Sequence, residues 1–156
     1  SQADLIRKKL MSVRMRLYAT RAYLESRPPI DQIEDITNHR LICQSPTSFQ
    51  VAAGATLVQH LLTYEVPSLL TVNNYFGALQ GVIANLGVGV LPDYVTEDFP
   101  DLVRVLPEIE SGEVPVFLAY PEELRQSKRV AAFRDFVQDE IFSHRRKIKE
   151  LSGLGN

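Results

Sequence analysis

The segment from Ser68 to Pro92 constrains the fold more than any other, because it places a strand, a helix and a second strand in immediate succession. Ser68 to Val72 predicts a strand, and Asn73 and Asn74 are typical helix caps. Apolar side chains then recur three or four residues apart, which predicts a helix with one buried face: Phe76, Leu79, Val82, Ile83 and Leu86. Val88 to Leu91 is wholly apolar, as expected for a strand covered on both faces of a parallel sheet.

Strands and helices alternate along the rest of the chain. The patterns predict strands within Leu5–Ala19 and at Leu41–Gln44, Leu102–Leu106 and Val114–Tyr120. They predict helices after Thr20, after Asp31 with Glu34 completing a capping box, at Ala55–Leu62, after Pro92 and from about Ser127 to Glu150. We therefore expect an α/β domain with a mainly parallel sheet flanked by helices. A chain of 156 residues can bury a core of that kind without disulfides or metals.

Four glycines cluster around the Phe76–Leu86 helix, namely Gly77, Gly81, Gly87 and Gly89. A dinucleotide-binding fingerprint places its glycines between the strand and the start of the helix, whereas these lie inside and after the helix. We expect close packing at Gly77 and Gly81 and turn geometry at the other two. Gly87 is the position at which we expect the helix to end in the left-handed conformation.

Composition and charge exclude several classes of function. The 17 Lys and Arg residues are balanced by 19 Asp and Glu residues, so these residues lack the basic excess of a domain that wraps nucleic acid. Cys43 is the only cysteine, which rules out an internal disulfide, and its strand context predicts a small buried side chain. No apolar run approaches a membrane span, and no secretion signal is evident. We expect a cytoplasmic domain that binds no membrane.

The sequence offers no catalytic or metal-binding constellation. His39, His60 and His144 lie far apart with no second ligand at zinc-site spacing, and no Gly-x-Ser-x-Gly element surrounds a serine. The basic residues from Arg145 to Lys149 suit the end of a helix, where the dipole favours cations. We expect no enzyme activity, no metal and no cofactor.

The junction between the strand ending at Val72 and the following helix is the candidate ligand site. It would present two amide side chains, Asn73 and Asn74, and the free backbone N–H groups of Tyr75 and Phe76 to a small polar or anionic ligand. Ser45 begins a hydroxyl-rich run after another strand, and Thr20 follows a third, so we expect both at the same sheet edge. The alternative for each is a simple role as helix cap or turn residue.

The segment Leu70–Pro92 resembles the most characteristic part of the effector-binding domain of LysR-type transcriptional regulators. In that family an apolar strand and a helix are followed by Gly-x-Gly, an apolar run and proline, matched here by Gly87, Gly89 and Pro92 with one apolar residue fewer. Three further stretches follow the family's order: Leu17–Leu24, Ile33–Ile42 and Val114–Val137. The resemblance spans about residues 4 to 145.

This resemblance implies a two-subdomain fold like that of type 2 periplasmic binding proteins, with a small-molecule effector in the cleft between subdomains. Residues 1–151 would form a fragment of the effector-binding domain: the second subdomain over about 20–115, crossover strands and a returning helix over 5–19 and 114–150, and a frayed tail over 152–156. The family's winged helix-turn-helix and the first half of its first subdomain have no counterpart here. DNA would be touched only through that missing domain.

The resemblance thus implies a bacterial regulator's ligand-sensing and oligomerising part, without catalysis. Apolar residues of the final helix would otherwise be exposed, and the Phe76–Leu91 unit resembles the family's dimer surface, so we expect self-association, with a homodimer or tetramer in the parent. A solute-binding component of a transporter shares the fold and is the alternative.

Overall fold

A computed structural model describes residues 4–45 and 52–140. The chain forms two compact units, one over Arg14–Val114 and one over Ser1–Val13 together with Pro115–Asn156. The expected helical residues after 140, the basic run from Arg145 to Lys149, His144, the tail after 151 and the hydroxyl residues after Ser45 lie outside the described residues. No described helix is long and apolar enough to cross a membrane.

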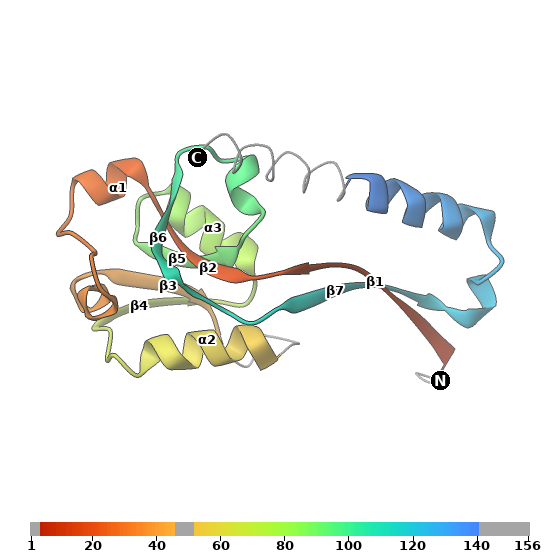
Figure 1. The fold of residues 1–156 in the computed structure, drawn as a ribbon, viewed down its shortest axis with the longest axis horizontal. Helices are drawn as coiled ribbons and strands as arrows, with labels where there is room; N and C mark the ends of the chain where they lie inside the picture. Colours follow the sequence, from red (N-terminus) through yellow and green to blue (C-terminus); the bar gives the residue numbers. More distant parts are fainter. Residues whose placement is uncertain (1–3, 46–51, 141–156) are drawn as a thin grey trace. The chain divides into compact units, whose positions relative to one another are not determined.

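The Arg14–Val114 unit is built on a five-stranded sheet in the order β4-β3-β5-β2-β6 (Figure 1). The strands are β2 (Met15–Thr20), β3 (Arg40–Gln44), β4 (Ser68–Val72), β5 (Val88–Pro92) and β6 (Leu102–Glu110). Strand β3 pairs in parallel with β4 and β5, whereas β2 runs antiparallel to both β5 and β6. The expected α/β fold is confirmed, but one inner strand of its sheet runs against the other four.

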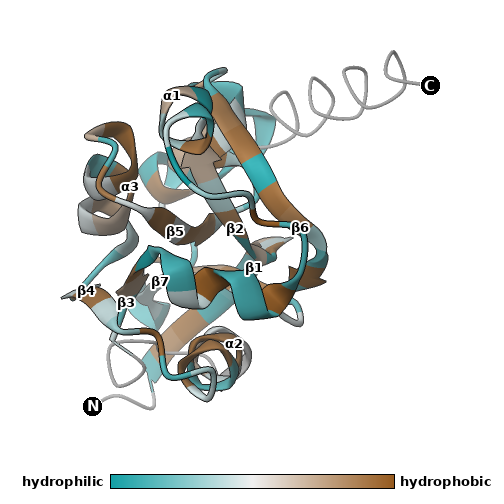
Figure 2. Ribbon diagram, turned by 90° about the vertical axis from the view of Figure 1, so that its left-hand side faces the viewer, coloured by the Kyte–Doolittle hydropathy of each residue, from teal (hydrophilic) through white to brown (hydrophobic). Residues whose placement is uncertain are grey.

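Helices cover both faces of this sheet (Figure 2). The α2 helix (Ala52–Leu62) packs on one face and α3 (Tyr75–Ile83) on the other, and shorter turns complete the layers: α1 (Arg21–Glu25), η2 (Ile33–Asn38) and η4 (Val95–Glu97). Alternate side chains of each strand point to opposite faces of the sheet. Leu41 and Cys43 pack in the hydrophobic core under α2 (the α2 core), while Ile42 between them packs in the core under α3 (the α3 core). Burial on both faces is why the inner strands are apolar without alternation.

The turn after Asp31 differs from the expected helix. It is a 3-10 helix that begins one residue later than the sequence pattern suggests, at Ile33. The carboxylate that accepts from the preceding backbone is therefore Asp35, from the N–H of Asp31 at 2.9 Å and of Gln32 at 3.0 Å, and the predicted Glu34 capping box is wrong.

The end of α3 also corrects a prediction. Asn85, not Gly87, adopts the left-handed conformation, with φ of 62°, and the N–H of Leu86 donates to the Gly81 carbonyl at 3.0 Å. Asparagine tolerates this conformation better than most side chains. Gly87 is required for space instead, because a Cβ there would lie 2.3 Å from the Arg40 carbonyl oxygen. The close packing expected at Gly81 is confirmed, with Ile42 Cδ1 3.1 Å from such a Cβ.

The second unit contains a two-stranded sheet of β1 (Leu5–Val13) and β7 (Val114–Pro121), the turn η5 (Glu122–Leu124) and a helix described over 128–140. The division between units falls at Arg14, whereas the sequence suggested about residue 20. Residues 15–19, expected among the crossover strands, are part of β2 inside the five-stranded sheet. A period-two pattern identifies a strand but not the sheet to which it belongs.

Candidate ligand-binding site

The junctions after β3 and β4 lie together at one edge of the five-stranded sheet. The N–H of Ser45 donates to the Val72 carbonyl at 3.0 Å, and the Gln44 side-chain amide donates to the Asn73 carbonyl at 3.3 Å. This carboxyl edge, where β3, β4 and β5 end, therefore contains Ser45, Asn73 and the start of α3, as the parallel pairing predicts.

Asn73 and Asn74 have different roles despite being adjacent. Asn74 is the N-cap of α3, and its Oδ1 accepts from the N–H of Gly77 at 3.1 Å. The Asn73 side chain is exposed and makes no hydrogen bond to another described residue. The first turn of α3 contains no acidic residue, so its remaining N–H groups face no side-chain anion of their own helix.

An aromatic group lies at the same junction. The rings of Tyr75 and Phe76 stack at 4.6 Å, and Tyr75 meets Tyr94 edge to face at 6.3 Å. Phe76 is 61% exposed. Burial raises the pKa of Tyr94, and a hydrogen bond with Tyr75 raises it further, so this hydroxyl stays protonated. Tyr94 was not predicted, although its place two residues after β5 was a signal for it.

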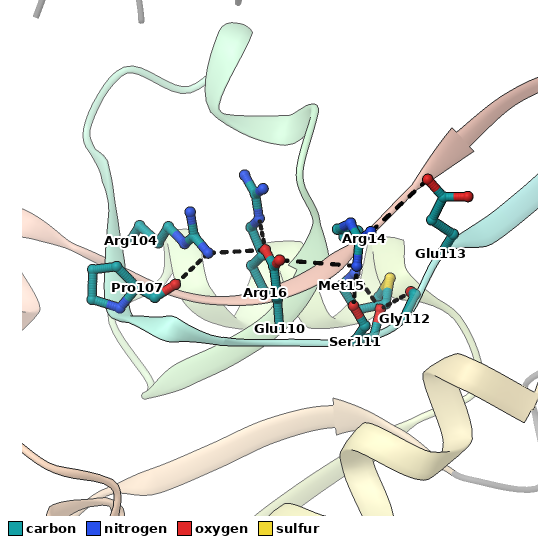
Figure 3. Close-up of polar contacts among 9 residues, drawn as sticks. All are labelled: Arg14, Met15, Arg16, Arg104, Pro107, Glu110, Ser111, Gly112 and Glu113. Atoms are coloured by element: carbon teal, nitrogen blue, oxygen red, sulfur yellow. Dashed lines mark hydrogen bonds and ion pairs between the residues drawn. The ribbon is translucent and has the colours of Figure 1, made fainter.

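An arginine cluster extends the carboxyl edge (Figure 3). The Glu110 carboxylate accepts from Arg16 Nε at 3.0 Å and from Arg104 Nη2 at 3.0 Å, and Arg14 Nη1 lies 3.9 Å from it. Arg16 pairs with Leu91 near the end of β5, which places Arg16 at the carboxyl edge of the parallel strands, near Asp93. The alternation of β2 puts Arg16 on the same face as Tyr18, the face that α3 covers.

The position of Glu110 in this cluster depends on a bulge in β6, which the sequence pattern did not predict. Leu17 pairs with Val105 but Arg16 pairs with Glu110, so residues 106–109 loop out, beginning at Leu106 with φ of 50°. Arg104 Nη2 bridges this bulge by donating to both the Pro107 carbonyl and Glu110. Beyond the bulge, the buried Ser111 hydroxyl accepts from the N–H of Met15 at 2.8 Å.

Thr20 does not belong to this edge, and the expectation that it lies beside Asn73 is wrong. Because β2 runs antiparallel to β5, its last residue lies at the opposite edge, where β3, β4 and β5 begin. There Thr20 Oγ1 caps α1 by accepting from the N–H of Tyr23 at 3.1 Å and donates to Asn85 Oδ1.

Cys43 and His39, the other side chains that could carry chemistry, are buried and have structural roles. Cys43 is fully buried in the α2 core, and burial raises the pKa of its thiol to about 11. His39 is buried and its Nδ1 lies 2.8 Å from the Tyr23 hydroxyl. Within residues 4–45 and 52–140, no three His, Cys, Asp or Glu residues gather as a metal site would require.

The family model described as the LysR substrate binding domain matches residues 1–141. The chain belongs to this family. LysR substrate-binding domains are the ligand-sensing domains of transcriptional regulators and are not enzymes, as the sequence led us to expect. The transporter alternative is not favoured.

Solved LysR-type regulators have the same fold. The regulatory domain of CrgA from Neisseria meningitidis is 18% identical over 90% of this chain and 70% of that one, with a TM-score of 0.68. The regulatory domain of AphB from Vibrio vulnificus is 20% identical over 86% and 69%, with a TM-score of 0.58. Full-length AphB from Vibrio cholerae is 20% identical over 90% of this chain, with a TM-score of 0.60. This chain spans only 49% of that longer protein. A search of curated proteins finds no match.

Proposed function

We propose that this chain senses a small anionic effector for a LysR-type transcriptional regulator in the cytoplasm, and that the effector binds at the carboxyl edge of the five-stranded sheet. The observation that supports this most is the collection of donor groups at that edge. Ser45, Asn73 and Arg16 follow or begin three different strands, yet they share one edge. Three inter-strand spacings separate β4 from β2, so the edge spans about 14 Å, enough for a small organic acid.

The chemistry of this edge favours an anion. Arg16 supplies a guanidinium whose Nε is held by Glu110, and α3 supplies the backbone N–H groups of Tyr75 and Phe76 at its positive end. The Asn73 amide adds a donor that carries no charge of its own.

A thermal-shift screen of small carboxylates on this chain tests the proposal. A true effector should raise the midpoint of unfolding in a saturable way. Arg16→Gln and Asn73→Ala should each abolish that rise, whereas Thr20→Ser, at the opposite edge, should keep it. A ligand that stabilises all four proteins equally binds elsewhere and would contradict the assignment.

We also propose that the parent protein is a homodimer or tetramer that binds DNA through a region outside this chain. The chain has a net charge of −2, which gives it no basic surface excess of its own. The outer side of α3 is apolar, with Phe76, Ile83 and, just beyond the helix, Leu86 exposed. An exposed apolar stripe of this kind is typical of a protein interface.

A further inference from the structure

A pocket lies at the opposite edge of the sheet from the proposed effector site. It has a volume of about 270 Å³ and sits where β3 and β4 begin and α3 ends. Two guanidinium groups, an imidazole, amides and hydroxyls line it, including Arg27, Arg40, His39, Asn38, Ser68 and Asn85. Among the described residues, no Asp or Glu does so.

Both arginines of this pocket are oriented without a carboxylate. Arg40 Nε donates to Ser68 Oγ at 3.0 Å, which leaves its terminal nitrogens available. The Arg27 guanidinium lies over the Tyr23 ring, 5.4 Å from its centroid. Neither arginine forms an ion pair with any residue in the described ranges, although the arginines of the opposite edge share Glu110. Two positive charges therefore border one small pocket to which the described residues contribute no counter-ion.

His39 adds a polar group to the wall. It is 4% exposed, and its ring is held by the Tyr23 hydroxyl 2.8 Å from Nδ1. In the tautomer in which Nδ1 accepts from that hydroxyl, Nε2 is a donor. Nε2 meets no acceptor at hydrogen-bond geometry in the part of the chain that the structure describes, although the Pro28 carbonyl is close enough to raise the pKa of the ring.

We propose that this pocket binds a small phosphate group between Arg27 and Arg40. Guanidinium groups recognise phosphate through paired, charge-assisted hydrogen bonds, and the neighbouring amides and hydroxyls can donate to the remaining oxygens. The volume holds a phosphate with a small organic substituent. This site shares no residue with the proposed effector edge and stands independently of it.

The test is an NMR titration of the isotopically labelled chain with inorganic phosphate at constant ionic strength, with sodium chloride as the balancing salt. We expect saturable shifts of the Nε–Hε signals of Arg27 and Arg40. Arg27→Ala and Arg40→Ala should each weaken binding about tenfold or more, because each removes a charge-assisted contact. Arg21→Ala is the matched control: it removes the same charge from the first residue of α1, outside the lining of this pocket, and should leave binding unchanged.

Two additions keep the result decisive. Ser68→Ala leaves every charge in place but frees the Arg40 side chain, and should weaken phosphate binding severalfold while the backbone spectrum shows an intact fold. Shifts that fail to saturate, or that respond equally to Arg21→Ala and Arg27→Ala, would overturn the proposal as general electrostatic attraction. Saturable binding of malonate without binding of phosphate would assign the pocket to carboxylates and overturn the phosphate assignment.

Discussion

At the scale of single residues, the two adjacent asparagines separate a structural role from a binding role. Asn74 satisfies the N–H of Gly77 at the start of α3, while the Asn73 side chain is exposed beside it. The sequence showed that one of the pair would cap the helix, but either could have done so. Only the backbone path, with Asn74 extended at φ of −153° and the helix beginning at Tyr75, decides between them.

We predict a measurable loss of stability on removal of the Asn74 side chain and almost none on removal of the Asn73 side chain. Asn74→Ala should lower the free energy of unfolding by about 1 kcal/mol through loss of the cap, and Asn74→Asp should restore most of it. Asn73→Ala should change the free energy of unfolding by less than about 0.5 kcal/mol. Urea unfolding followed by circular dichroism measures all three. A larger loss from Asn73→Ala than from Asn74→Ala would show that the cap is assigned to the wrong residue.

His39 should make stability depend on pH. Burial lowers its pKa from the ordinary value of 6.5, and Arg27 lowers it further, while the Pro28 carbonyl and Asp35 act in the opposite direction. Well above pH 6.5 the imidazole is neutral in both the folded and the unfolded chain, so His39 does not make the free energy of unfolding depend on pH. As pH falls from 6.5 towards the lower folded value, the unfolded chain binds the proton first, and stability declines.

The measurement is the free energy of unfolding between pH 8 and pH 5 for the natural chain, His39→Gln and His60→Gln. We expect the decline below pH 6.5 to be shallower in His39→Gln and unchanged in His60→Gln, since His60 lies exposed on α2. Equal slopes in the natural chain and His39→Gln would contradict the role given to His39.

At the scale of secondary structure, the sequence predicted which elements exist better than how they pair. Strands β3, β4 and β5 and helix α3 lie close to their predicted ranges, because apolar periodicity and caps are local signals. The direction of β2 is not local: its alternating pattern suits a strand of either direction, and only its pairing with β5 and β6 fixes it. Because β2 runs antiparallel to β5, Thr20 lies at the edge of the sheet opposite Asn73, and not beside it as predicted.

The connection between β2 and β6 supplies a second prediction at this scale. Ser111 and Glu110 both tie β6 to β2, but Ser111 is buried whereas Glu110 is about one-third exposed. Ser111→Ala leaves the buried N–H of Met15 without its acceptor, and should cost about 1–3 kcal/mol. Glu110→Gln keeps a hydrogen-bond acceptor for Arg16 and Arg104 in a screened site, and should cost less than about 1 kcal/mol.

Chemical denaturation of the two variants compares these losses directly, with Glu113→Gln as the control for removal of an exposed carboxylate near the cluster. A Glu110→Gln variant that loses more stability than Ser111→Ala would show that the arginine cluster, rather than the buried hydroxyl, holds the bulged strand in place.

At the scale of the whole molecule, the candidate site could be predicted only in part. Residues after β3 and β4 were found because parallel strands end at one edge, a rule that needs no coordinates. Arg16 was missed because its place at this edge depends on the inserted antiparallel strand and on the loop-out of residues 106–109 that brings Glu110 opposite it. Tyr94 follows β5 and was within reach of the same rule that found Asn73. The phosphate pocket was missed for a similar reason, since its residues come from the starts of strands and the end of a helix.

The outer surface of α3 leads to the last prediction. Phe76 is 61% exposed and Ile83 37% exposed, and their spacing of seven residues places both on one side of the helix, away from the buried Ala78 and Val82. Leaving such a stripe in water is unfavourable, so we expect a second copy of the chain to cover it. The other unit also exposes Phe133 (56%) and Phe136 (63%), which could cause association of a different kind.

Sedimentation equilibrium at about 100 µM should therefore use a background in which Phe133→Ser and Phe136→Ser remove that second apolar surface. We expect this background to be a dimer. Adding Ile83→Lys should shift it to a monomer, because a charge placed in an apolar interface must lose its hydration without gaining a partner. His60→Lys adds the same charge on α2, across the sheet from α3, and should leave the dimer intact. A monomeric background, or a dimer that survives Ile83→Lys, would remove α3 from the interface.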